Sequence, residues 1–110
     1  MNLCKRRMSC TICILSIVAF LIVFVGCSKE SKIERHWKKG EIYFSQNKFK
    51  EAVIEYKNII QLEPKHSQAY HRLGMAYLNI GMITEGMAAL TRAVEMNPDL
   101  LDARNQLGRL

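Results

Sequence analysis

The sequence has no acidic residue before Glu30 and no cysteine after Cys27. It also has no glycine-rich phosphate loop, and no serine or cysteine nucleophile has a base and an orienting acid in register with it. The three histidines, His36, His66 and His71, lack the spacing of metal ligands, so we interpret them as side chains that are solvated or line a groove. These absences argue against an enzyme, a metal site and a bound cofactor.

The N-terminal segment has the layout of a secretory signal. Three basic residues, Lys5, Arg6 and Arg7, precede an uncharged apolar run over residues 12–25. As a helix this run would be about 21 Å long, against about 30 Å for the hydrocarbon core of a bilayer. The alternative is a retained signal anchor in the inner membrane, since residues 8–11 could lengthen the helix.

The end of this run, Phe24-Val25-Gly26-Cys27, resembles the lipobox of bacterial lipoprotein precursors, in which a cysteine follows a small residue. The resemblance implies a signal peptide over residues 1–26, cleavage before Cys27 and a diacylglyceryl group on its thiol. Two or three acyl chains would supply the multiple signals that stable membrane anchoring needs. Residues 27–32 would form the lipidated cysteine and a polar tether, and no second cysteine would remain for a disulfide.

The charge balance excludes one class of partner. Lys5, Arg6 and Arg7 account for three of the sixteen basic residues, which leaves thirteen basic against ten acidic residues after the signal. These charges are interleaved and form no basic tract, so we expect no nucleic-acid ligand.

A 34-residue interval is the strongest pattern that is present. It separates the only two prolines, Pro64 and Pro98, and it also separates Gly40 from Gly74 and Gly74 from Gly108. A recurrence of this length indicates a small helical unit whose apolar face is buried by its neighbour. Hydrophobic periodicity predicts helices at about 32–46, 49–62, 67–80 and 83–96, with a fifth that begins near 99.

The predicted breaks between helices have turn chemistry. Asn47 and Gly81 occupy corresponding positions and can adopt the left-handed conformation that ends a helix. Pro64 and Pro98 cannot extend a helix and disfavour helical geometry in the residue before them, so each closes one unit.

These residues resemble the tetratricopeptide repeat, a helix-turn-helix unit with the same interval. The matching positions, to which the resemblance gives packing roles, are Gly40, Tyr43, Ala52, Tyr56 and Pro64 in the first unit and Leu73, Gly74, Tyr77, Leu90, Ala93 and Pro98 in the second. The pattern departs from the family at Lys39, Ile59 and Gly86. The resemblance implies an all-α solenoid of about two and a third repeats, over residues 33–66, 67–100 and 101–110. Because such arrays generally contain about three units and a closing helix, we expect the chain to be an N-terminal fragment, to come from a truncated reading frame, or to be completed by another protomer.

In this family the first helix of each unit lines a concave groove that binds proteins or peptides. Carried over, the groove residues are Trp37, Lys38, Glu41, Phe44, His71, Arg72, Met75, Leu78 and Asn79, with Glu34, Ser45, Gln68, Asp102, Asn105, Gln106 and Arg109 beside them. The set combines apolar anchors with cationic donors. The lysine and asparagine arrangement by which chaperone-type members grip a C-terminal carboxylate is not reproduced. Trp37 has a second interpretation, in which it shields the exposed end of the stack.

These features together predict a non-catalytic scaffold lipoprotein of the bacterial cell envelope, of the kind that serves pilus, secretion, cell-wall or exopolysaccharide assembly. Ser28 stands where an aspartate commonly favours inner-membrane retention, so the outer membrane is favoured if the source has one. The expected partners are a protein or peptide in the groove and a membrane through the lipid on Cys27. Two alternatives remain open: the targeting portion of a longer envelope enzyme, and a signal-anchored protein of the inner membrane.

Overall fold

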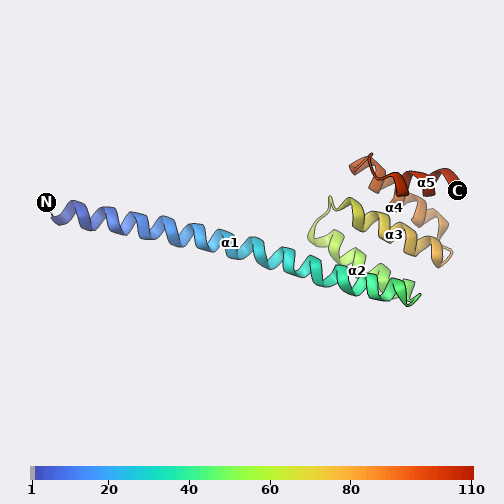
Figure 1. Ribbon diagram of the computed structural model, residues 1–110, viewed down its shortest axis with the longest axis horizontal. Helices are drawn as coiled ribbons and strands as arrows, with labels where there is room; N and C mark the ends of the chain where they lie inside the picture. Colours follow the sequence, from blue (N-terminus) through green and yellow to red (C-terminus); the bar gives the residue numbers. More distant parts are fainter. Residues whose placement is uncertain (1) are drawn as a thin grey trace. The chain divides into compact units, whose positions relative to one another are not determined.

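The computed structural model describes the backbone of residues 2–110 and the side chains of residues 11–20 and 28–110. Over this described backbone there are five α-helices and no strand. In chain order they are α1 (Asn2–Ser45), α2 (Phe49–Leu62), α3 (Ser67–Asn79), α4 (Ile83–Met96) and α5 (Leu101–Arg109). From α2 to α5, each helix packs against the next (Figure 1). The predicted all-helical repeat architecture is therefore confirmed, with α2 and α4 at the predicted bounds.

The first helix begins much earlier than predicted. α1 runs through residues 27–32, which we expected to be a tether ahead of a helix that starts near 32. The physical reason is that no glycine or proline lies between Cys27 and Gly40, while this stretch is rich in lysine and glutamate, which favour helix. The side chains of residues 28–32 are exposed.

The chain divides into two compact units, residues 1–32 and 33–110, which are described separately. In the first unit, the described side chains of residues 11–20 are exposed. Among the residues that the structure describes, no helix has the length and apolar character needed to span a bilayer. The lipobox, Phe24 to Cys27, lies outside the described side chains, so the signal peptide and the lipidation remain predictions.

Two turns at equivalent positions of the two repeats have the same geometry, which explains why the helices end where they do. Asn47 and Gly81 both have positive φ, 58° and 83° respectively. The N–H of Lys48 donates to the Tyr43 carbonyl (2.8 Å), and the equivalent bond of Met82 one repeat later is 2.9 Å long. A left-handed residue followed by this bond is the Schellman motif, which satisfies carbonyls at the end of a helix. The predicted left-handed turns are therefore present.

The proline breaks repeat in the same way. Glu63 and Asn97, which precede Pro64 and Pro98, have nearly identical extended conformations, with φ of −138° and −140° and ψ of 92° at both. Extended geometry is what the ring of a following proline imposes. Each proline thus turns the chain out of one repeat and into the next.

The core consists of small residues that allow close helix approach and a few large ones that fill the space between helices. The residues with almost no exposed surface are Ala52, Tyr56, Ile59, Ala69, Ala76, Leu90, Ala93 and Ala103. Gly40 is covered by the Tyr56 ring, since a Cβ at Gly40 would lie 2.8 Å from Tyr56 Cε1. Of the other signature positions, Leu73 and Gly74 are buried, Tyr43 and Tyr77 are half-buried, and both prolines are exposed in turns.

Candidate functional site

We call residues 33–110 the repeat unit. Two adjoining cavities lie along the side of it to which α1, α3 and α5 contribute. We call them together the groove. The first cavity, of about 300 Å³, is lined by Trp37, Gln68, His71, Arg72, Leu100 and Asp102. The second, of about 290 Å³, is lined by His71, Arg72, Met75, Asp102, Asn105, Gln106 and Arg109. Because His71, Arg72 and Asp102 line both, the two cavities form one continuous surface over α3 and α5.

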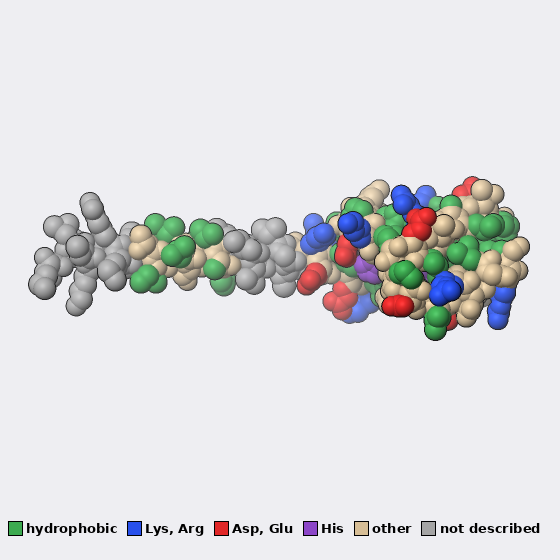
Figure 2. All heavy atoms as spheres, turned by 90° about the horizontal axis from the view of Figure 1, so that it is seen from above, with side chains coloured by type: hydrophobic (Ala, Val, Ile, Leu, Met, Phe, Trp, Pro, Cys, Tyr) green, Lys and Arg blue, Asp and Glu red, His purple; other side chains and the backbone are tan. Residues whose placement is uncertain are grey.

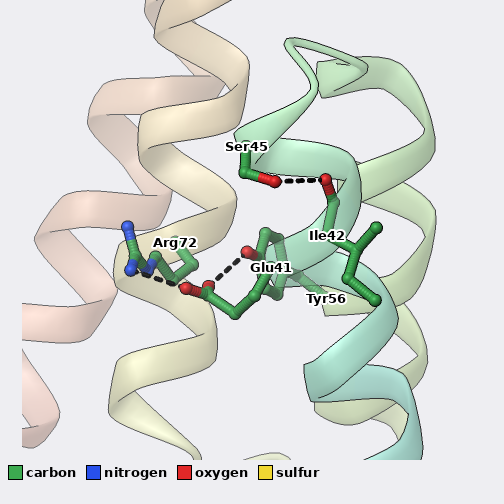
Figure 3. Close-up of polar contacts among 5 residues, drawn as sticks. All are labelled: Glu41, Ile42, Ser45, Tyr56 and Arg72. Atoms are coloured by element: carbon green, nitrogen blue, oxygen red, sulfur yellow. Dashed lines mark hydrogen bonds and ion pairs between the residues drawn. The ribbon is translucent and has the colours of Figure 1, made fainter.

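A carboxylate on α1 connects the groove to the core. The Tyr56 hydroxyl on α2 donates to Glu41 Oε1 (2.7 Å), and Arg72 Nη2 on α3 donates to Glu41 Oε2 (2.7 Å). Figure 3 shows the Glu41 carboxylate between these two partners, while Ser45 bonds separately to the Ile42 carbonyl. Burial, reinforced by the bond to Glu41, raises the pKa of Tyr56 well above its ordinary value, so the hydroxyl keeps its proton and donates.

Arg72 is held by an aromatic ring as well as by this carboxylate. Its guanidinium carbon lies 5.3 Å from the centre of the Phe44 ring. Phe44 in turn makes an edge contact with Phe49, with ring centres 5.1 Å apart. A cation over a ring face and a charge-assisted hydrogen bond are both favourable, so Arg72 has a defined position between α1 and α3.

Trp37 has a place in both the groove and the core. Its ring stacks on His66 with centres 5.7 Å apart and meets the Tyr56 ring edge-on at 5.8 Å. His66 Nδ1 accepts from the Ala69 N–H (3.1 Å), which caps the N-terminus of α3. Trp37 is half-buried and also lines the first cavity. The two interpretations of Trp37, anchor and shield, therefore each have contacts to support them.

His71 is a neutral hydrogen-bonding group in the groove at pH 7. Burial, together with the nearby charge of Arg72, lowers the pKa of His71 below its ordinary value, and Asp102 opposes this shift. A neutral imidazole offers one donor and one acceptor to a ligand.

Nine of the residues carried over to the groove line the cavities: Trp37, Gln68, His71, Arg72, Met75, Asp102, Asn105, Gln106 and Arg109. Glu41 and Phe44 contact Arg72 but line neither cavity. Lys38 pairs with Glu34 at 2.9 Å, where both side chains are mostly exposed and Lys38 lowers the pKa of Glu34.

Two predicted groove residues, Leu78 and Asn79, have other roles. Leu78 packs against the core cluster of Leu90, Ala93 and Ala103 instead. It occupies the space beside Gly86, where an added Cβ would lie only 2.7 Å from Leu78 Cδ2. Asn79 is exposed at the end of α3, and its side-chain amide donates to the Met75 carbonyl (2.8 Å).

Leu100 is the cavity residue that the sequence analysis missed. It is the residue immediately before α5, and although the predicted fifth helix begins near 99, the groove residues taken from it begin only at Asp102. The signal was available, because Leu100 lies one repeat interval after His66, and His66 holds the corresponding position beside Trp37.

The repeat unit has no surface of a single charge sign in the view of Figure 2, where Lys and Arg are interspersed with Asp and Glu. Within the described part of the chain, no group of three or more His, Cys, Asp or Glu side chains could hold a metal ion. The lining of the groove itself combines apolar side chains, amides and charges of both signs.

Comparison with known families identifies the repeats. A family model described as "TPR repeat" matches residues 40–81, and one described as "Tetratricopeptide repeat" matches residues 67–100. Residues 40–100 are therefore tetratricopeptide repeats, in agreement with the helix pairs and turns of the structure.

Curated relatives are similar to this chain at low identity. Hsp70-Hsp90 organizing protein 2 of Arabidopsis thaliana is 28% identical over 71 residues, which are 64% of this chain and 12% of the relative. DnaJ homolog subfamily C member 3 of Bos taurus is 25% identical over 102 residues, 86% of this chain and 20% of the relative. The chain thus spans a fifth or less of the length of these relatives.

Among solved structures, a chain of the complex described as "TPR2B-domain:pHsp70-complex of yeast Sti1" is similar to the repeat unit. The TM-score is 0.65 at 25% identity, and the match covers 66% of this chain and 58% of that chain.

Proposed function

We propose that residues 33–110 form an interaction scaffold whose groove binds a peptide segment of a partner protein. The two adjoining cavities carry this proposal, because together they form a concave surface about as large as a small-molecule site. Trp37, Met75 and Leu100 supply apolar contacts. The amides of Gln68 and Asn105 can both donate to and accept from a peptide backbone.

The relatives support the same function. The similar domain of yeast Sti1 is described in complex with pHsp70, and the Arabidopsis relative is named as an organiser of Hsp70 and Hsp90. The first description shows a repeat domain of this type in complex with another molecule, and the second names a protein that organises two others. The ligand of this chain depends on its own groove residues and is not given by the names of its relatives.

Photo-crosslinking with matched methionine positions tests the proposal. Benzoylphenylalanine replaces Met75, which lines the groove, or Met87, which is 41% exposed on α4 and lines neither cavity. We expect partner adducts from the Met75 position that are absent from the Met87 position in cells that express each full chain. Equal adducts from both positions, or adducts from Met87 alone, would refute the groove as the binding surface.

We also propose that the scaffold works at the bacterial cell envelope, held by lipid on Cys27, as an assembly factor for a pilus, secretion, cell-wall or exopolysaccharide system. The basic start, the apolar run and the lipobox resemblance support this proposal. Fractionation is expected to find the chain in the outer membrane where the source has one.

Metabolic labelling with palmitate tests the lipid anchor. Cys27→Ala should abolish incorporation and leave an uncleaved precursor, whereas Cys13→Ala, a matched change in the predicted signal, should leave both labelling and processing intact. Labelling that persists in Cys27→Ala would refute lipidation at this residue.

A further inference from the structure

We infer that Glu41 sets the charge preference of the groove: by engaging Arg72, it makes the groove select peptide segments that are not acidic. This inference rests on the proposed function of the groove and specifies its ligand class.

Arg72 is the cation that a ligand carboxylate would be expected to meet, since it lines both cavities. In the structure its Nη2 already donates to Glu41 Oε2 at 2.7 Å. Each side chain of the pair is only about one-third exposed, so solvent screens their electrostatic attraction less than that of a fully exposed pair. An acidic ligand that reached the remaining N–H donors of Arg72 would also meet the negative charge of the Glu41 carboxylate beside them.

Glu41 is held in place for this task. Its other oxygen accepts from the Tyr56 hydroxyl at 2.7 Å, and Tyr56 is fully buried. Turning the carboxylate away from Arg72 would also strain or break this second bond and leave a buried hydroxyl without its acceptor, which is costly. The negative charge of the Glu41 carboxylate is thus held beside Arg72.

The other charges that line the groove do not compensate. Asp102 and Arg109 contribute one negative and one positive charge, and Arg72 is neutralised by Glu41. The groove as a whole therefore has no net positive charge to attract a carboxylate. Removal of the Glu41 charge would leave Arg72 as an uncompensated cation at the centre of both cavities.

A selection from randomised octapeptides with blocked termini measures this preference. Wild-type chain should retain peptides whose Asp and Glu content does not exceed that of the library. Glu41→Gln should enrich acidic residues about five- to tenfold, the range expected when a partly buried arginine gains a charge-assisted bond to a ligand. Glu34→Gln is the matched control, because Glu34 and its partner Lys38 line neither cavity in the structure. It removes the same charge from this exposed pair and should behave as wild type.

The converse variant tests the same pair if Glu41→Gln folds poorly. Arg72→Gln leaves the Glu41 carboxylate unpaired and should enrich Lys and Arg among the retained peptides. The double variant, Glu41→Gln with Arg72→Gln, should return to the wild-type composition. Thermal unfolding of each variant checks that the repeats remain folded.

The outcomes separate the two proposals. If all variants retain peptides with the same Asp, Glu, Lys and Arg content as wild type, the role of Glu41 is overturned while the groove function stands. Peptides retained by none of the variants, wild type included, would count against the groove function itself.

Discussion

Gly74 on α3 and Gly86 on α4 face each other so closely that neither position has room for a side chain. A Cβ at Gly74 would lie 3.1 Å from the Gly86 carbonyl oxygen, and one at Gly86 would lie 3.2 Å from the Gly74 carbonyl oxygen. Leu90 covers the same spot, 2.8 Å from the added Cβ at Gly74. This contact sets the separation of α3 and α4 and, through α3, the position of the groove residues.

Gly74→Ala should destabilise the repeat unit by about 1–3 kcal/mol, because the added methyl group meets a backbone oxygen and the fully buried Leu90. Urea denaturation followed by circular dichroism measures the loss. Gly108→Ala is the control at the equivalent position of the next repeat, where an added Cβ meets nothing within 4 Å. No loss in Gly74→Ala relative to Gly108→Ala would show that the helices are not in close contact here.

His66→Ala should destabilise the fold by about 1 kcal/mol, since it removes the N-cap of α3, and the loss of the ring stacked on Trp37 adds to this. His66→Asp restores a capping acceptor without the ring, so it should recover part of the stability. Thermal unfolding of the three proteins gives the order. If His66→Ala unfolds at the same temperature as the wild type, the cap does not form in solution.

The stability of the fold should depend on pH through His71. Because its pKa is lower in the folded chain than its ordinary value of 6.5, the unfolded chain binds the proton more readily. The contribution of His71 is therefore complete above the ordinary value and is lost as the pH falls below it toward the folded value.

Paired urea titrations isolate this contribution. The free energy of unfolding of wild type minus that of His71→Gln should be constant near about pH 8 and should fall between about pH 7 and about pH 5. Subtraction cancels the titration of the other groups. A difference that rises as the pH falls would mean that the folded state stabilises the charged imidazole instead.

The repeat fold was predictable because its determinants are local. The regular spacing of Pro64 and Pro98 and the left-handed positions Asn47 and Gly81 fix where the helices stop, and both act through their own backbone. The start of α1 was not predictable in this way. No breaker lies between Cys27 and Gly40, and a polar composition alone does not distinguish a helix from a tether.

The groove was predictable only in part, since repeat position gives the side of a helix but not the partners of a side chain. His71 and Met75 line the cavities as this register predicted. Leu78 instead packs in the space that Gly86, which has no side chain, leaves open on α4. The pairing of Glu41 with Arg72 joins side chains from different repeats. It depends on the three-dimensional stacking of α1 and α3.

The most direct test of the groove is an NMR titration of the full chain with a peptide that it selects. The account predicts shifts of the side-chain amides of Gln68, Asn105 and Gln106 and of the Trp37 indole, with little change at Ile83 and Met87 on the exposed side of α4. Shifts concentrated at Ile83 and Met87, with the groove signals unchanged, would contradict it.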